Sequence, residues 1–277
     1  MTDATTLNWW HLLCAIAGLN LIAWTASTAW LNRQRPDGTT WPHQRLQLLL
    51  SALYVLGCGY RSFLPVFDVP RVVMVDSFAS SVIVGRTVAT IAELSFAAQW
   101  ALLLRGGALA TGHRPALRVA HAIVPMIAVA EINSWYAVLT TRNLGHVVEE
   151  TLWGLAAVLS VMAMGGLWRR VGPRGRTWLG VAIAAGVVYA AYMFFVDVPM
   201  YWARWVADQA AGRNYPSLSA GIADAAGRWT VSHDWAHWRT EVVWMTLYFS
   251  VAVWISIALA HVRLPLRPVR WRRLGRQ

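Results

Sequence analysis

Seven apolar stretches, each about as long as a membrane is thick, limit what this chain can fold into more than any other feature. A helix needs about 20 mainly apolar residues to cross the hydrocarbon core of a bilayer. Pro, Gly, Asn or Arg separates each stretch from the next, as expected at helix ends. The sequence therefore predicts an all-α polytopic membrane protein, with residues 1–277 forming a single domain of about seven transmembrane helices. The stretches lie near Trp9–Leu31, Leu46–Val66, Ser81–Leu104, Leu117–Thr140, His146–Trp168, Trp178–Trp202 and His233–Val262.

The composition agrees with a membrane location. Hydrophobic residues make up 57% of the chain and charged residues only 13%, about half the charged share of ordinary globular proteins. The formal net charge of +11 comes from arginine, because the sequence contains no lysine. The arginines lie mostly between the apolar stretches and form no stripe with interleaved aromatic residues, which argues against nucleic acid as a partner. We expect a multi-pass protein of a bacterial-type inner or plasma membrane.

The arginines also predict how the chain is oriented. Sixteen of them fall in one set of alternate loops and seven in the other, with Arg86 inside a span. Positively charged loops remain in the cytoplasm, so the N-terminus is predicted outside and residues 263–277 form a basic cytoplasmic tail. The long connection near 203–232 is predicted to be an outer interfacial cap of short amphipathic helices. Of the thirteen acidic residues, only Asp37 falls on the cytoplasmic side.

The start of the last stretch carries two histidines and a glutamate at helical spacing. His233, His237 and Glu241 are each four residues apart, so on a helix they would share one face. This spacing lets two imidazoles reach one metal ion, with a carboxylate one turn deeper. We therefore predict a divalent metal, zinc or iron, with the two histidines as its primary ligands.

A second group of the same residue types opens the fifth stretch. His146, Glu149 and Glu150 again fall on one helix face, and Glu131 lies just inside the outer end of the fourth stretch. We predict that His146, with Glu150 or Glu241, completes the metal shell. Glu149 or Glu131 would then be the catalytic residue, acting as general base toward a metal-bound water.

Two ionisable residues lie deeper in the third stretch. Arg86 and Glu93 are seven residues apart on one face and are expected to neutralise each other. Placing an ionisable group within a membrane costs free energy, so such a residue is first considered for a functional role. The acids toward the outer face are therefore open to three interpretations: a metal centre, a charge network without metal, and a proton or ion path.

The leading hypothesis is a metal-dependent enzyme that acts on a lipid or other hydrophobic substrate at the outer leaflet. Three-ligand zinc would suit a hydrolase, and carboxylates with histidines would suit a di-iron oxidoreductase; the sequence does not choose between them. The alternatives are a proton- or ion-coupled transporter that uses intramembrane acids, and a membrane assembly or scaffold subunit. The sequence contains no HExxH, GxSxG, P-loop or GxGxxG motif, so zincin, serine-hydrolase and nucleotide-dependent mechanisms lack their parts.

The late HxxxH pair of His233 and His237, with Asp197 before it, resembles the membrane zinc hydrolases of the alkaline ceramidase and adiponectin-receptor superfamily. The resemblance is confined to these residues. Those families also carry a serine and a histidine four residues apart in an early span, and this sequence has no such pair there. We carry no function over from the resemblance.

Overall fold

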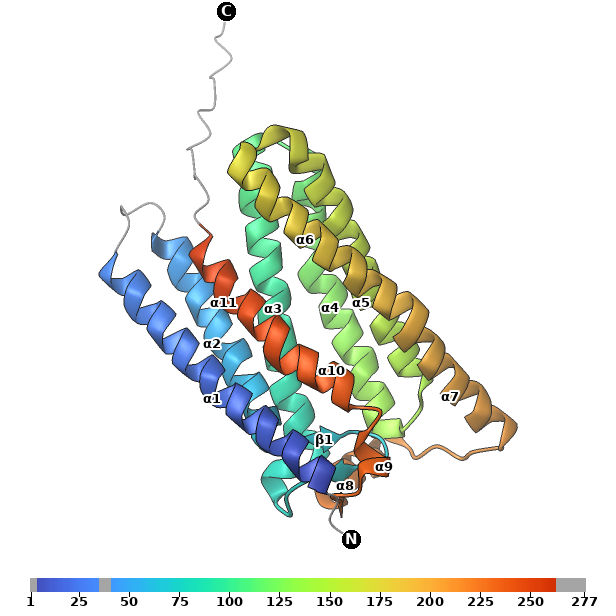
Figure 1. The fold of residues 1–277 in the computed structure, drawn as a ribbon. Helices are drawn as coiled ribbons and strands as arrows, with labels where there is room; N and C mark the ends of the chain where they lie inside the picture. Colours follow the sequence, from blue (N-terminus) through green and yellow to red (C-terminus); the bar gives the residue numbers. More distant parts are fainter. Residues whose placement is uncertain (1–3, 35–40, 263–277) are drawn as a thin grey trace, which may run out of the picture.

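The computed structural model describes residues 4–34 and 41–262, which form an elongated bundle of helices with a small cap at one end (Figure 1). The first half of the chain contains α1 (Ala4–Arg33), α2 (Trp41–Phe63), β1 (Val66–Phe67), β2 (Val72–Val73), η1 (Phe78–Ser80), α3 (Val82–Thr111) and α4 (Arg114–Thr140). The second half contains α5 (Leu144–Leu167), η2 (Trp168–Arg170), α6 (Pro173–Tyr192), η3 (Met193–Asp197), α7 (Val198–Ala210), α8 (Leu218–Gly227), β3 (Thr230–Val231), α9 (Trp235–Trp238), α10 (Val242–Leu247), η4 (Tyr248–Ala252) and α11 (Val253–His261).

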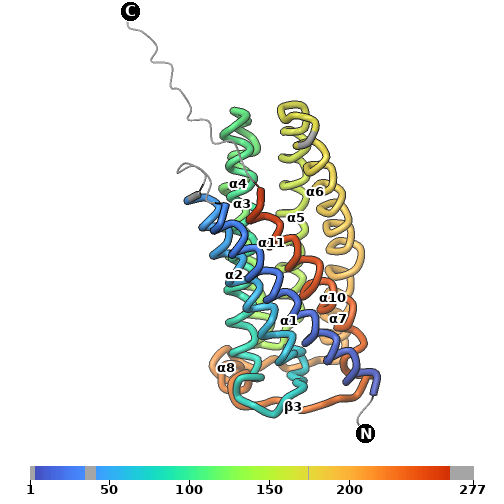
Figure 2. Tube along the Cα trace, turned by 60° about the vertical axis from the view of Figure 1, so that its left-hand side comes forward, coloured from blue at the N-terminus to red at the C-terminus, as the bar shows by residue number. Residues whose placement is uncertain are grey.

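The chain is an all-α polytopic membrane protein. Six helices in the described residues are long and apolar enough to cross a membrane: Ala4–Arg33, Val82–Thr111, Arg114–Thr140, Leu144–Arg170, Gly175–Ala210 and Val242–His261. Each corresponds to one of the predicted apolar stretches. The remaining stretch forms α2, which is not among the six, although it runs beside α1 and α3 in both views (Figures 1 and 2). The count of seven spans and the side of the membrane that each end faces stay predictions.

Polar side chains explain why α2 is less apolar than its neighbours. Gln47 and Gln99 are fully buried and each donates from its side-chain amide to the other's backbone carbonyl, at 3.0 and 3.1 Å. Gln99 also donates to the Ser256 carbonyl at 3.1 Å. Hydrogen bonds between helices are a common means of association in membranes, where apolar contact alone gives little driving force. This network ties α2, α3 and α11 together.

A cap closes one end of the bundle, next to the start of α1, while α11 ends at the opposite end (Figure 1). Its centre is a small sheet in which β1 pairs antiparallel with β2, and β2 pairs parallel with β3. Helix α7 continues to Ala210, and the outer interfacial cap near 203–232 stays a prediction. Residues 66–80, between α2 and α3, also contribute two strands and a short helix, which the sequence did not indicate.

The last span begins later than expected. We predicted a helix from His233, but α10 begins at Val242. The preceding residues are held in the cap: the Ser232 N–H donates to the Val73 carbonyl at 3.0 Å, and the Asp234 side chain caps the short helix α9. Pairing with a strand far away in the sequence thus replaces the helix that local spacing favoured. The predicted basic tail, residues 263–277, lies outside the described residues.

Glycines allow close contact between α4, α5 and the sixth span. A Cβ atom on Gly145 would lie 2.6 Å from the Asn133 carbonyl oxygen and 2.8 Å from the Ala137 Cβ. A Cβ atom on Gly154 would lie 2.9 Å from the Phe194 ring. Small residues at such positions let membrane helices approach each other closely. The contacts bring α4 and α5 together at the cap end of the bundle.

Two π-helical turns interrupt the late spans. Met193–Asp197 (η3) lies between α6 and α7, and Tyr248–Ala252 (η4) lies between α10 and α11. A π-helical turn adds one residue to the helical repeat and often occurs near functional sites, because it redirects side chains. The first of these turns ends at Asp197, one of the acids that the sequence places toward the outer face.

Candidate functional site

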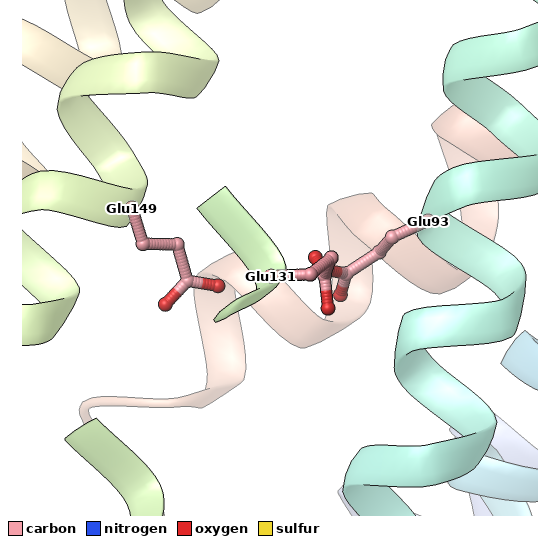
Figure 3. A group of neighbouring side chains, drawn as sticks. All are labelled: Glu93, Glu131 and Glu149. Carbon is pink, nitrogen blue, oxygen red and sulfur yellow. The ribbon is translucent and has the colours of Figure 1, made fainter. Parts of the chain in front are cut away.

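Arg86 lies at the centre of a buried group of acidic side chains contributed by three helices. Its Nη2 atom is 3.0 Å from a carboxylate oxygen of Glu93 on α3, 2.9 Å from one of Glu131 on α4 and 3.2 Å from one of Glu149 on α5. Figure 3 shows the three carboxylates pointing toward a common space. We call Glu93, Glu131 and Glu149 the glutamate cluster. The predicted pair of Arg86 and Glu93 is confirmed, within this larger group.

The glutamate cluster lies inside the spans, toward the cap end. At about 1.5 Å per helical residue, Glu131 is roughly 13 Å before the end of α4, and Glu149 is roughly 8 Å after the start of α5. Arg86, Glu131 and Glu149 are 6%, 3% and 4% exposed. These charges are therefore removed from both water and lipid.

A second arginine and an aspartate adjoin the glutamate cluster from the cap. Asp68, in the turn between β1 and β2, has one carboxylate oxygen 3.7 Å from Arg61 Nη2 and the other 3.9 Å from Arg86 Nη1. Arg61 also donates to the Val66 carbonyl at 3.0 Å. Arg61 and Asp68 neutralise each other, so they supply no counter-charge to the glutamates.

Hydrogen bonds fix the orientation of two of the glutamates. The Thr90 hydroxyl donates to Glu131 at 2.6 Å and accepts from the Trp135 indole N–H at 3.1 Å. His146 Nδ1 is 2.7 Å from the second oxygen of Glu149. Carboxylates that bind metal ions are commonly held by such outer partners. The arrangement therefore positions Glu131 and Glu149 before any ligand arrives.

The glutamate cluster has three carboxyl groups but only one guanidinium in direct contact with all of them. Uncompensated buried charge is strongly destabilising, so the carboxyl groups that Arg86 does not balance must either hold a proton or bind a further cation. Within residues 4–34 and 41–262, Glu93, Glu131 and Glu149 each place one oxygen within 4.8 Å of the other two. The second oxygen of Glu131 is buried and has no hydrogen-bond partner among the described residues. Such an arrangement can take up a divalent cation.

Further acids lie on the side of the cluster that faces the late spans. Glu150 interacts electrostatically with Glu149 and with Asp197, and Asp197 interacts with Glu241. Glu241 is buried and accepts hydrogen bonds from the Trp244 indole N–H at 2.6 Å and from the Thr240 hydroxyl at 3.0 Å. The predicted residues Glu150 and Glu241 therefore belong to a second group of acids, beside the three glutamates that share Arg86.

The two histidines predicted as primary metal ligands lie in the cap. His233 Nε2 is 3.0 Å from the Met74 carbonyl oxygen, and His237 Nδ1 is 2.8 Å from the Ser232 hydroxyl. His233 precedes α9 and His237 lies within it, so the shared helix face that we predicted for them and Glu241 does not form. Their role as ligands stays a prediction without that geometric support.

The structure thus joins some of the predicted site residues and separates others. It brings together His146, predicted as a metal ligand, with Glu131 and Glu149, the two candidates for the general base. In the enzyme hypothesis Glu93 was expected only as a structural partner of Arg86, although its position inside a span was already a signal of function. Thr90 carried no such signal, because hydroxyl side chains are ordinary in membrane helices.

Beside the cluster lies one narrow internal space. Glu93, Arg61, Cys58, Trp244 and Tyr248 are among the residues that line it. Its free volume is about 10 Å³, which is enough for about one water molecule. This space is too small for a hydrophobic substrate.

Comparisons with known proteins give no family for this chain. No protein-family model matches it, and no curated protein and no solved structure matches it. Any functional inference therefore rests on the geometry of the chain itself.

Proposed function

We propose that this protein is a metal-dependent membrane enzyme that acts on a lipid or another hydrophobic substrate, with its metal ion held by Glu93, Glu131 and Glu149. The convergence of three buried carboxyl groups on a single guanidinium carries the proposal. A divalent cation would balance the carboxylates that Arg86 leaves without a counter-charge. Arg86 would then turn away from the glutamates toward Asp68, whose carboxylate is already 3.9 Å from its Nη1 atom.

The donor atoms narrow the choice of metal. Carboxylate oxygens favour hard or intermediate ions such as Mg²⁺, Mn²⁺ and Fe²⁺, whereas structural zinc sites are rich in cysteine and histidine. The cluster therefore favours iron or manganese over the zinc that the histidine spacing suggested. When bound, such an ion would act as a Lewis acid or activate a water molecule.

Metal content tests this proposal directly. The full-length protein is purified in detergent without chelator and subjected to elemental analysis, alongside the variants E131Q/E149Q and H233A/H237A. Wild type should retain roughly one equivalent of a divalent metal, since a buried site with three carboxylates binds tightly. E131Q/E149Q should lose it, while H233A/H237A should keep it.

Each other result has a clear meaning. Loss of metal from H233A/H237A but not from E131Q/E149Q would move the site to the cap and reject the glutamate cluster. Wild type that stays metal-free after reconstitution with iron, manganese and zinc would reject the metal altogether. If the metal is present, incubation with a membrane lipid extract, followed by mass spectrometry of the lipids, tests for turnover. The E131Q/E149Q protein serves as the inactive control.

Two observations favour a second candidate, an ion-coupled carrier. Arg86 already occupies the position between the glutamates that a cation would take, and the adjoining space is the size of a water molecule or a small ion. A carrier of this kind would exchange a cation against the guanidinium during transport. The test is cation flux into proteoliposomes. Flux in wild type that is lost in E131Q/E149Q, with no change of the lipids in the turnover assay, would establish the carrier and reject the enzyme.

A further inference from the structure

Helix α5 turns into α6 at the end of the bundle opposite the cap (Figures 1 and 2), and residues of this turn line a separate cleft. It has a volume of about 470 Å³, within the range of small-molecule binding sites. Its lining residues are Gly165, Gly166, Trp168, Arg169, Arg170 and Ile183. We call it the basic cleft.

The basic cleft combines positive charge with an absence of acids. Arg169 and Arg170 are exposed, and no ion pair found among the described residues involves either of them. Arg170 donates one hydrogen bond, from Nη1 to the Thr111 carbonyl at 3.2 Å. A guanidinium has five N–H donors, so this contact positions Arg170 while leaving donors for a ligand.

The first turn of α6 follows Arg170 closely in the chain, although its residues are not among those that line the cleft. This helix begins at Pro173, and its N-cap residue, Gly172, has no side chain to cap the backbone N–H groups. The unpaired N–H groups and the helix dipole at such an N-terminus favour an anion. Arg176 folds back toward the same turn and donates to the carbonyls of Trp168 and Val171, each at 3.2 Å.

The other walls of the cleft are small or apolar. A Cβ atom added to Gly165 would have no neighbour within 4 Å, whereas one added to Gly166 would lie 2.7 Å from the His113 ring. Trp168 packs on Gly180 of α6, and Ile183 of α6 forms part of the wall. Arg170 is the last residue of the span Leu144–Arg170, so the basic rim lies where lipid headgroups lie.

From this geometry we propose that the basic cleft binds the phosphate group of an anionic phospholipid. Arg169 and Arg170 contact the phosphate oxygens, for which guanidinium groups are well suited. One acyl chain lies along Ile183. Basic pockets between membrane helices are a general means of recognising anionic headgroups. The site is remote from the glutamate cluster and does not depend on its function.

Lipid binding by the intact protein tests the proposal. Native mass spectrometry of the full-length chain in detergent is used to titrate phosphatidylglycerol, with phosphatidylcholine as the zwitterionic comparison and inorganic phosphate as competitor. R169Q/R170Q should weaken binding of phosphatidylglycerol at least about tenfold, the effect of losing charge-assisted hydrogen bonds. R114Q/R118Q is the matched control, because these exposed arginines belong to the same end of the bundle but do not line the cleft.

A second variant fills the cleft without changing its charge. G165L places a side chain in open space and should block phosphatidylglycerol as strongly as R169Q/R170Q does. G18L, at a glycine of α1 that also has open space around it, should bind like wild type. The thermal midpoint of each variant in the same detergent reports whether it is folded.

Three results would overturn the proposal. Equal losses in R114Q/R118Q and R169Q/R170Q would mean that the lipid responds to general surface charge. Unchanged binding in G165L would mean that the cleft is not occupied. Displacement of phosphatidylglycerol by an equal concentration of inorganic phosphate would mean that the arginines take free phosphate rather than a lipid.

Discussion

Replacing Arg86 with methionine should make the stability of this protein depend on a divalent metal. The guanidinium contacts all three members of the glutamate cluster at 2.9–3.2 Å and is 6% exposed. Methionine is unbranched and apolar and ends two atoms short of the guanidinium nitrogens, so R86M removes the resident cation while filling the space around the arginine stem. The three carboxylates are then left together without a counter-charge.

The expected cost is large because the site is buried. Removing one partner of a buried ion pair costs about 3–5 kcal/mol, and Arg86 serves three carboxylates, so R86M in chelator should lie at the upper end of that range. Binding of a divalent ion at 100 times its dissociation constant would return about 2.7 kcal/mol. Wild type should gain less from metal than R86M, because in wild type the ion must displace the guanidinium.

The assay is unfolding in detergent micelles, with and without chelator, followed by addition of manganese or iron. R61M is the matched control: Arg61 is also buried and lies beside the same site, but it pairs with Asp68 and not with the glutamates. R61M should be destabilised without being rescued by metal.

Two outcomes would refute the reasoning behind R86M. Equal metal responses in R86M and R61M would show that the glutamates form no cation site. If R86M in chelator were as stable as wild type, the glutamates would carry no uncompensated charge in the folded protein.

Two further predictions concern the cap. A Cβ atom on Gly221 would lie 2.1 Å from the Leu139 carbonyl oxygen, so G221A should destabilise the protein by about 1–3 kcal/mol through overpacking, whereas G227A, in the same helix with open space around it, should change the thermal midpoint little. Hydrogen bonds, above all from Arg228, lower the pKa of Asp224. The stability that the ionised carboxylate contributes to the folded protein is therefore fully present above the unfolded carboxyl pKa of about 3.9. This stability is lost as the pH falls through the lower pKa of the folded state. Hydrogen exchange of the cap amides should rise below about pH 4 in wild type; D224N should exchange faster already at neutral pH, and identical pH profiles for the two proteins would contradict this role.

The sequence alone determined the spans, because hydrophobic length is a local property of the chain. The apolar stretches correspond to six membrane-length helices and to α2, with shifted ends. It also predicted that Arg86 and Glu93 pair, since residues two turns apart share one helix face and these long side chains can span the distance between them. In both cases the relevant neighbours are near in sequence, and helical periodicity is enough to find them.

Only the tertiary structure decided which acids form one site. Glu149 joins Glu131 at Arg86 where Gly145 lets α5 approach α4 closely, a consequence of packing that no spacing rule contains. The structure also separated the two histidines that the spacing rule had joined. His233 has helical spacing to His237, yet β3 pairs with β2 just before it and holds this segment in the cap. A long-range backbone pairing outweighed a local periodic preference, because an isolated helical turn in a loop gains too little by itself.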